Sequence, residues 1–87
     1  MKTYSVNFPT LDLYMNYTVT ADSPRQAVHK GAKEACKYNP DYRRVFCESE
    51  DRVRGYVVQS PVVDDDVCHM FEVTACQEIA FRAYSIQ

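Results

Sequence analysis

Two clusters of carboxylate side chains in this sequence could bind a partner. They fall in two short segments, Glu48, Glu50 and Asp51 in the first and Asp64, Asp65 and Asp66 in the second. Such runs often only keep loops and sheet edges soluble. They can also form a negative surface that meets a basic protein surface, because complementary charge speeds association and fixes orientation.

Aromatic side chains must supply most of the affinity if the carboxylates bind a partner, because an exposed ion pair contributes only about 0–1 kcal/mol. The sequence has seven tyrosines, four phenylalanines and no tryptophan. Large aromatic residues near the centre of an interface often dominate the binding energy. We expect Tyr14, Phe46 and Tyr56 to be partner-binding residues together with the two acidic segments.

Cysteine and histidine could bind a metal ion or supply a nucleophile. The candidates are Cys36, Cys47, Cys68, Cys76, His29 and His69. Zinc ligands usually occur as close pairs such as C-x₂-C, and no such pair is present. Cys68 and His69 are adjacent, so in a strand their side chains point to opposite faces. We therefore expect reduced thiols, no metal ion and no other cofactor.

Sequence motifs for catalysis are missing. The chain has no glycine-rich phosphate loop, no nucleophile elbow and no metalloprotease helix signature. No pattern places a histidine beside a cysteine with a third group that would orient it. We expect a protein that is not an enzyme.

Charge and hydropathy narrow the choice of partner and compartment. The net charge of −2 and the pI of about 5.6 are unlike those of a general nucleic-acid binder, which is basic. The first residues lack the apolar core of a secretory signal, and no stretch is long enough to span a membrane. We expect a cytoplasmic protein that binds neither nucleic acid directly nor a membrane.

One helix is predicted over residues 22–39, and the rest of the chain is expected to pack around it. Ser23 is a suitable N-cap, Pro24 fits the first helical position, and Gln26 completes a capping box. Asn39 followed by Pro40 predicts the end of the helix. Small and apolar residues recur at helical spacing, which predicts a stripe that packs closely on a sheet: Ala27, Val28, Gly31, Ala32, Ala35 and Cys36.

Alternating apolar and polar residues predict strands on both sides of this helix. The expected strands cover residues 2–8, 11–21, 42–49, 52–60, 67–75 and 79–86, with a bulge at Gly55. The expected order is thus two strands, one helix and four strands, in a single domain over residues 1–87. This predicts an α+β fold in which one helix packs on one face of a mainly antiparallel sheet. Solvent or a partner then covers the other face.

The segment Thr-Ala-Asp-Ser-Pro-Arg-Gln-Ala, which begins at Thr20, precedes the small-residue helix and follows an aromatic-rich strand pair. With the short chain length, this pattern resembles small phage and mobile-element proteins of the anti-CRISPR inhibitor kind. The resemblance implies a non-enzymatic inhibitor of a host defence complex. Its partner would be a host protein or ribonucleoprotein complex with a basic surface, in the host cytoplasm. The resemblance transfers no catalytic residues.

Two other functions remain open. The protein could be a small adaptor that pairs through an exposed sheet edge. It could also be an oligomer, for example a homodimer, that sequesters a nucleotide signal, for which Arg52, Arg54 and Tyr56 are the local candidates. Both alternatives require binding rather than catalysis.

Overall fold

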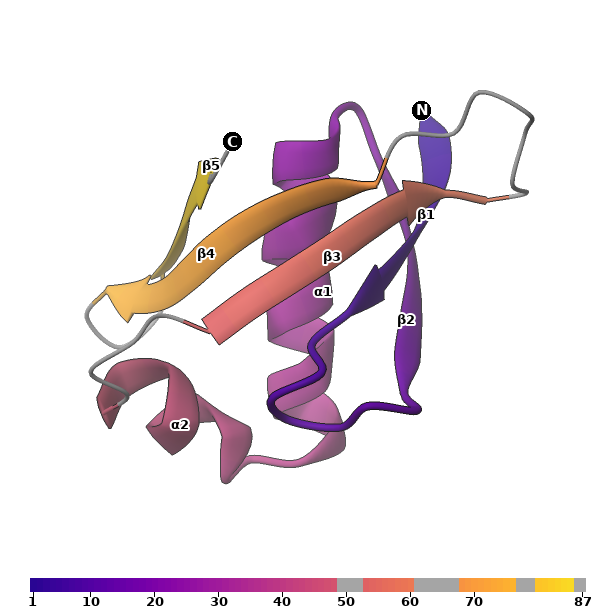
Figure 1. Cartoon of the computed structure of the whole chain (residues 1–87). Coiled ribbons are helices and arrows are strands. Elements are labelled where there is room, and N and C mark those ends of the chain that lie inside the picture. The colour runs from indigo at the N-terminus through magenta and orange to yellow at the C-terminus, as the bar shows by residue number, and fades with distance from the viewer. Residues whose placement is uncertain (49–52, 61–67, 77–79, 86–87) are drawn as a thin grey trace.

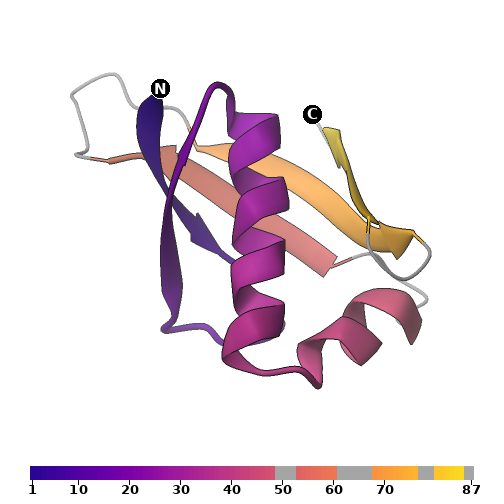
Figure 2. The ribbon, with the colours of Figure 1, turned by 180° about the vertical axis from the view of Figure 1, so that it is seen from behind.

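A 15-residue helix, α1 (Pro24–Tyr38), covers one face of the sheet in the computed structural model, which describes residues 1–48, 53–60, 68–76 and 80–85. Figure 2 shows α1 in front of the strands. Ser23 is the N-cap, and its Oγ accepts a hydrogen bond from the Gln26 N–H at 3.2 Å. The Gln26 Oε1 accepts from the Asp22 N–H at 2.6 Å, one residue before the cap. The predicted helix and its Ser23 N-cap are confirmed, whereas the Gln26 side chain binds one residue before the N–H that a capping box would use.

Five strands in the described part of the chain form one antiparallel sheet in the order β2-β1-β3-β4-β5. They are β1 (Lys2–Asn7), β2 (Asn16–Ala21), β3 (Val53–Gln59), β4 (His69–Cys76) and β5 (Ala80–Ser85). Strands β2 and β5 are the edges. Figure 1 views the sheet from the face that α1 leaves open, with β3 and β4 in front of the helix. The predicted α+β class, with an antiparallel sheet and a helix on one face, is confirmed.

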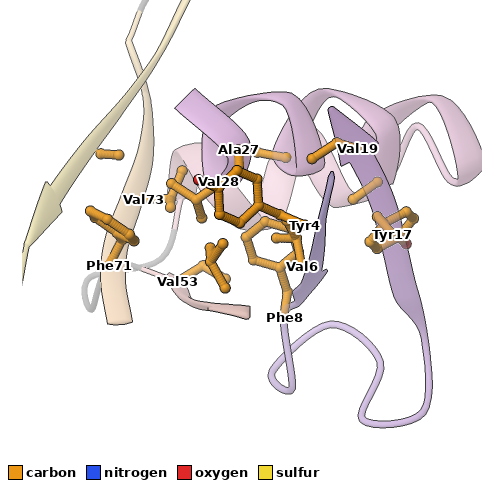
Figure 3. Packing of buried hydrophobic residues seen from close by; sticks show 14 of the residues in the cluster. Tyr4, Val6, Phe8, Tyr17, Val19, Ala27, Val28, Val53, Phe71 and Val73 are labelled. Atoms are coloured by element: carbon orange, nitrogen blue, oxygen red, sulfur yellow. The ribbon is translucent and has the colours of Figure 1, made fainter. Parts of the chain in front are cut away.

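The core lies between α1 and the sheet (Figure 3). Alternate residues of the strands, together with Phe8 just after β1, supply one side of it: Tyr4, Val6, Phe8, Tyr17, Val19, Val53, Val57, Phe71 and Val73. The helix supplies Ala27, Val28, Ala32 and Ala35, all fully buried. Because these helix residues are small, the α1 backbone can lie close to the strands, as the sequence predicts.

The prediction of a strand over residues 42–49 is wrong. The structure has a short helix there instead, α2 (Tyr42–Glu48). Asn39 starts the turn: its Oδ1 accepts from the Asp41 N–H at 3.1 Å, and its carbonyl accepts from the Tyr42 N–H at 3.0 Å. Within α2 the Phe46 side chain is only 1% exposed and meets Phe8 edge-on, with 5.5 Å between ring centroids. Tertiary burial of one aromatic residue therefore outweighs the strand preference of the local sequence.

The start of the second strand also differs from the prediction. Strand β2 begins at Asn16 rather than at residue 11, and the residues before it form turns. Leu13, expected on the buried face of a strand, is 60% exposed.

The bulge predicted at Gly55 is absent from β3, which pairs with β4 in an unbroken register that places Gly55 opposite Phe71. Gly55 is needed for space instead. A Cβ at this position would lie 2.6 Å from Val28 Cγ2 and 2.7 Å from Phe8 Cε1. The equivalent position on the helix is Gly31, where a Cβ would lie 2.6 Å from Val6 Cγ1.

Replacing Gly31 by Ala should therefore destabilise the protein, although the same change in an exposed helix usually stabilises it by about 1 kcal/mol. Overpacking against the stiff Val6 side chain should lower the free energy of unfolding by about 1–3 kcal/mol. Urea unfolding measures this difference, with Lys33→Ala on the exposed side of α1 as the control. A more stable Gly31→Ala variant would show that α1 and β1 do not approach so closely.

Candidate functional site

The β1–β2 loop, residues 8–15, is held by its own hydrogen bonds. The N–H groups of Leu11 and Asp12 donate to the Phe8 carbonyl at 2.9 and 3.0 Å. The Asp12 Oδ1 accepts from the Tyr14 N–H at 3.0 Å, which is the usual bond of an Asx turn. These bonds define a turn on each side of Asp12.

Asn7, the last residue of β1, ties this loop to the sheet. Its Nδ2 donates to the Met15 carbonyl at 2.8 Å and lies 3.4 Å from the carbonyl oxygens of Asp12 and Leu13. The loop backbone therefore depends on one amide side chain that the sheet positions. A change at Asn7 should loosen the loop without removing a core side chain.

The β1–β2 loop displays two large apolar side chains to solvent. Tyr14 is 88% exposed and Leu13 is 60% exposed. A tyrosine ring offers apolar contact area and a hydroxyl at little entropic cost, so it suits the centre of a protein interface. A loop that is already ordered also loses less entropy on binding than a flexible one. Tyr14, which sequence reasoning selected, remains a predicted partner-binding residue in this setting.

Tyr56 lies on the open face of the sheet, away from α1. It is partly buried and pairs with Asn7 on one side and Met70 on the other. Arg54 and Val58 lie on the same face of β3, because they are two residues away in the strand. Tyr56 therefore stays a predicted contact, next to the residue that holds the β1–β2 loop.

Phe46 was expected to contact a partner, and this prediction is wrong. The ring is buried against Phe8 at the junction of α2 with the sheet, so a partner surface cannot reach it without unfolding α2. Its place is in the core. Sequence reasoning missed this because it assigned Phe46 to a strand with one open face.

The acidic residues predicted to bind a partner fall largely outside the described residues. Glu48 is the last residue of α2. Glu50, Asp51, Asp64, Asp65 and Asp66 all lie outside the described ranges, and so does Arg52 of the nucleotide alternative. Their proposed role therefore continues to rest on the sequence.

Cys36, Cys47 and Cys68 are free thiols. Burial raises the pKa of the Cys36 thiol, while nearby Arg43 lowers it and Cys47 raises it. Raising the pKa leaves less thiolate at neutral pH, so Cys36 is a poor nucleophile. Among the described residues, no group of three or more Cys, His, Asp and Glu side chains is placed to hold a metal ion.

Three residues of the site were missed by sequence reasoning, Asn7, Asp12 and Leu13. All three were assigned to strands from their alternation. Pro9, Thr10 and Asp12 stand in the same segment and favour turns, so a turn could have been predicted there. The hydrogen bonds of the Asn7 side chain, which reach residues five to eight positions further along the chain, could not have been predicted.

Comparisons with protein-family models, with curated proteins and with solved structures return no match. No helix in the described ranges is both long and apolar enough to cross a membrane.

His29 on α1 should make the stability of the protein depend on pH. Burial, and then the positive charge of Lys33, lowers the pKa of His29 from its ordinary 6.5. The unfolded chain then binds a proton more readily than the folded one, so stability is lost as the pH falls through about 6.5. We expect the free energy of unfolding to fall between about pH 7.5 and pH 5.5, and to fall less in His29→Gln.

Urea unfolding at both pH values measures this effect. His69→Gln is the matched control, since it removes the other histidine of the chain. An equal pH dependence in wild type and His29→Gln would contradict the assignment.

Proposed function

We propose that this protein acts by binding another protein, and that the β1–β2 loop is its anchor. The observation that carries the proposal is that an ordered loop holds an exposed tyrosine. Asn7 and Asp12 hold the loop backbone by hydrogen bonds, and the Tyr14 side chain is 88% exposed. An exposed tyrosine on an ordered loop is well suited to fill a pocket on a partner.

Binding without catalysis is the proposed mode of action. The side chains that the loop presents at its tip are a leucine and a tyrosine, whose main contribution is contact area. The carboxylate within the loop, that of Asp12, already accepts a hydrogen bond from the Tyr14 N–H. The loop therefore offers an adhesive surface rather than a set of reacting groups.

The biological role that we propose is inhibition of a host defence complex in the host cytoplasm, as the resemblance to anti-CRISPR proteins implies. The partner would be a protein or ribonucleoprotein with a basic surface. The acidic net charge of −2 supports this choice, because complementary charge speeds association. In this proposal the acidic segments steer the encounter, and Tyr14 holds the complex together.

Replacing Tyr14 by Ala should shorten the lifetime of the complex. Loss of a central aromatic contact typically costs about 2 kcal/mol, which corresponds to dissociation roughly 30 times faster. A captured partner immobilised on a sensor surface provides the measurement. Asn7→Ser should weaken binding less, by loosening the loop, while the core of the protein stays intact.

Tyr56→Ala is the comparison that tests which surface is the anchor. If it speeds dissociation and Tyr14→Ala does not, the open sheet face binds the partner and the loop proposal is wrong. The inhibitory role is tested separately, by adding the protein to a reconstituted RNA-guided nuclease and measuring target cleavage. Unchanged cleavage across a panel of such complexes would argue against that role.

Replacing Asp64, Asp65 and Asp66 together by Asn should slow association and flatten its dependence on salt, because exposed charges act mainly on the rate of encounter. The dissociation rate should change little. Stopped-flow measurements at low and high salt detect the difference. Unchanged association at low salt would mean that these carboxylates only keep the chain soluble.

A further inference from the structure

Among the described strands, β2 lies at one edge of the sheet and pairs only with β1. The hydrogen bonds around it show which of its backbone groups point outward. The Thr3 carbonyl accepts from the Ser60 N–H at 2.8 Å, so it faces the β3 side of β1. Thr3 lies opposite Thr20 in the antiparallel ladder of β1 and β2. The two therefore form a pair that exchanges no backbone hydrogen bonds, and the N–H and C=O of Thr20 point away from the sheet.

A second contact agrees with this direction. Lys30 Nζ, on α1, donates to the Thr20 carbonyl at 2.6 Å from outside the sheet. Since backbone direction alternates along a strand, Thr18 also turns its N–H and C=O outward. The edge of β2 thus presents backbone donors and acceptors at the spacing of an antiparallel strand.

An open groove of about 510 Å³ runs between this edge and α1. Its lining combines the strand with one flank of the helix: Thr18, Val19, Thr20, Lys30, Lys33, Glu34 and Lys37. Lys37 Nζ lies 3.2 Å from Glu34 Oε1 in an exposed ion pair, which is a weak interaction. Three ammonium groups against one carboxylate leave the groove positive, although the whole chain is acidic.

We propose that this groove binds an extended acidic segment of a partner protein, which adds to the sheet as a strand beside β2. Both backbone groups of Thr18 and the N–H of Thr20 would form the ladder, since Lys30 already binds the Thr20 carbonyl. Lys33 and Lys37 would pair with carboxylates on alternate residues of the segment. Strand addition gains affinity from main-chain hydrogen bonds and specificity from side chains at every second position. Tyr14 is not among the residues that line this groove, so the proposal stands independently of the anchor loop.

The positive charge of the groove favours an acidic segment over a second copy of this chain. Pairing β2 with β2 of another molecule would bring two sets of lysines toward each other, and like charges oppose association. The outward N–H and C=O groups favour a peptide over a nucleic acid, which has no matching backbone ladder. Lysines at an edge strand also hinder unselective pairing with neutral strands. An acidic segment would instead be attracted by these lysines, because its carboxylates carry the opposite charge.

A synthetic peptide of about eight residues in which Val alternates with Glu is the probe, labelled for fluorescence anisotropy. We expect it to bind, and the same peptide with Lys in place of Glu not to bind. Rising salt should weaken the binding, because the paired charges are exposed. Amide hydrogen exchange of Thr18 and Thr20 should slow in the presence of the Val–Glu peptide.

Thr18→Pro tests the ladder directly. Proline removes an N–H that points to solvent, which an edge strand tolerates, so the fold should survive. We expect at least about tenfold weaker peptide binding than with Thr18→Ala, which keeps the N–H. Thermal unfolding verifies that both variants fold.

Lys33→Gln tests the charge, with about two- to fivefold weaker binding expected. Arg44→Gln is its matched control, because Arg44 is exposed on α2, which lies on the other side of α1 from β2 (Figure 2). It should leave peptide affinity unchanged.

Three results would overturn the proposal. These are the absence of binding by the Val–Glu peptide, equal binding by folded Thr18→Pro and Thr18→Ala, and equal binding of the Val–Glu and Val–Lys peptides. Tighter binding of a single-stranded oligonucleotide than of the Val–Glu peptide would assign the groove to nucleic acid instead.

Discussion

The close approach of α1 to the sheet is the constraint on which the rest of this structure depends. It is made possible where side chains are missing: Gly31 leaves room for Val6, and Gly55 leaves room for Val28 and Phe8. Larger groups would meet stiff or buried side chains there, and close-packed interiors adjust poorly to added volume. A helix held so near the strands brings its long side chains within reach of the sheet edges.

Basic side chains of α1 form hydrogen bonds at both edges of the sheet. Lys30 donates to the Thr20 carbonyl of β2, and Arg25 donates to the Ala83 carbonyl of β5 while lying 5.9 Å from the centre of the Phe71 ring. One helix thus packs on the sheet with its small residues and binds the backbone of both edges with its long ones. A helical pattern predicts that these basic side chains only face solvent. In the structure, they also form tertiary contacts.

Local chemistry was sufficient to predict α1 and most of the sheet. Ser23 and Asn39-Pro40 mark the ends of the helix within a residue or two, and helical spacing identifies Ala32 and Ala35 as residues that face the sheet. The failures have a common cause. Phe46 forms part of a helix because Phe8, far away in the sequence, offers a surface to pack on. Leu13 is exposed because the Asn7 side chain holds the loop backbone in another path. Neither partner is visible to a pattern of neighbouring residues.

Asn7 also links the surfaces that we assign to binding. Its backbone pairs with Asn16 and Tyr56 across the sheet, and its side chain holds the loop that carries Tyr14. The loop ends where β2 begins, so its hydrogen bonds also fix the first residue of the open edge. A partner held by Tyr14 would therefore find two adjoining surfaces, the Tyr56 side of the sheet and the edge of β2. Because Asn7 already orders the loop in the free protein, a partner that contacts several of these surfaces at once loses little loop entropy on binding.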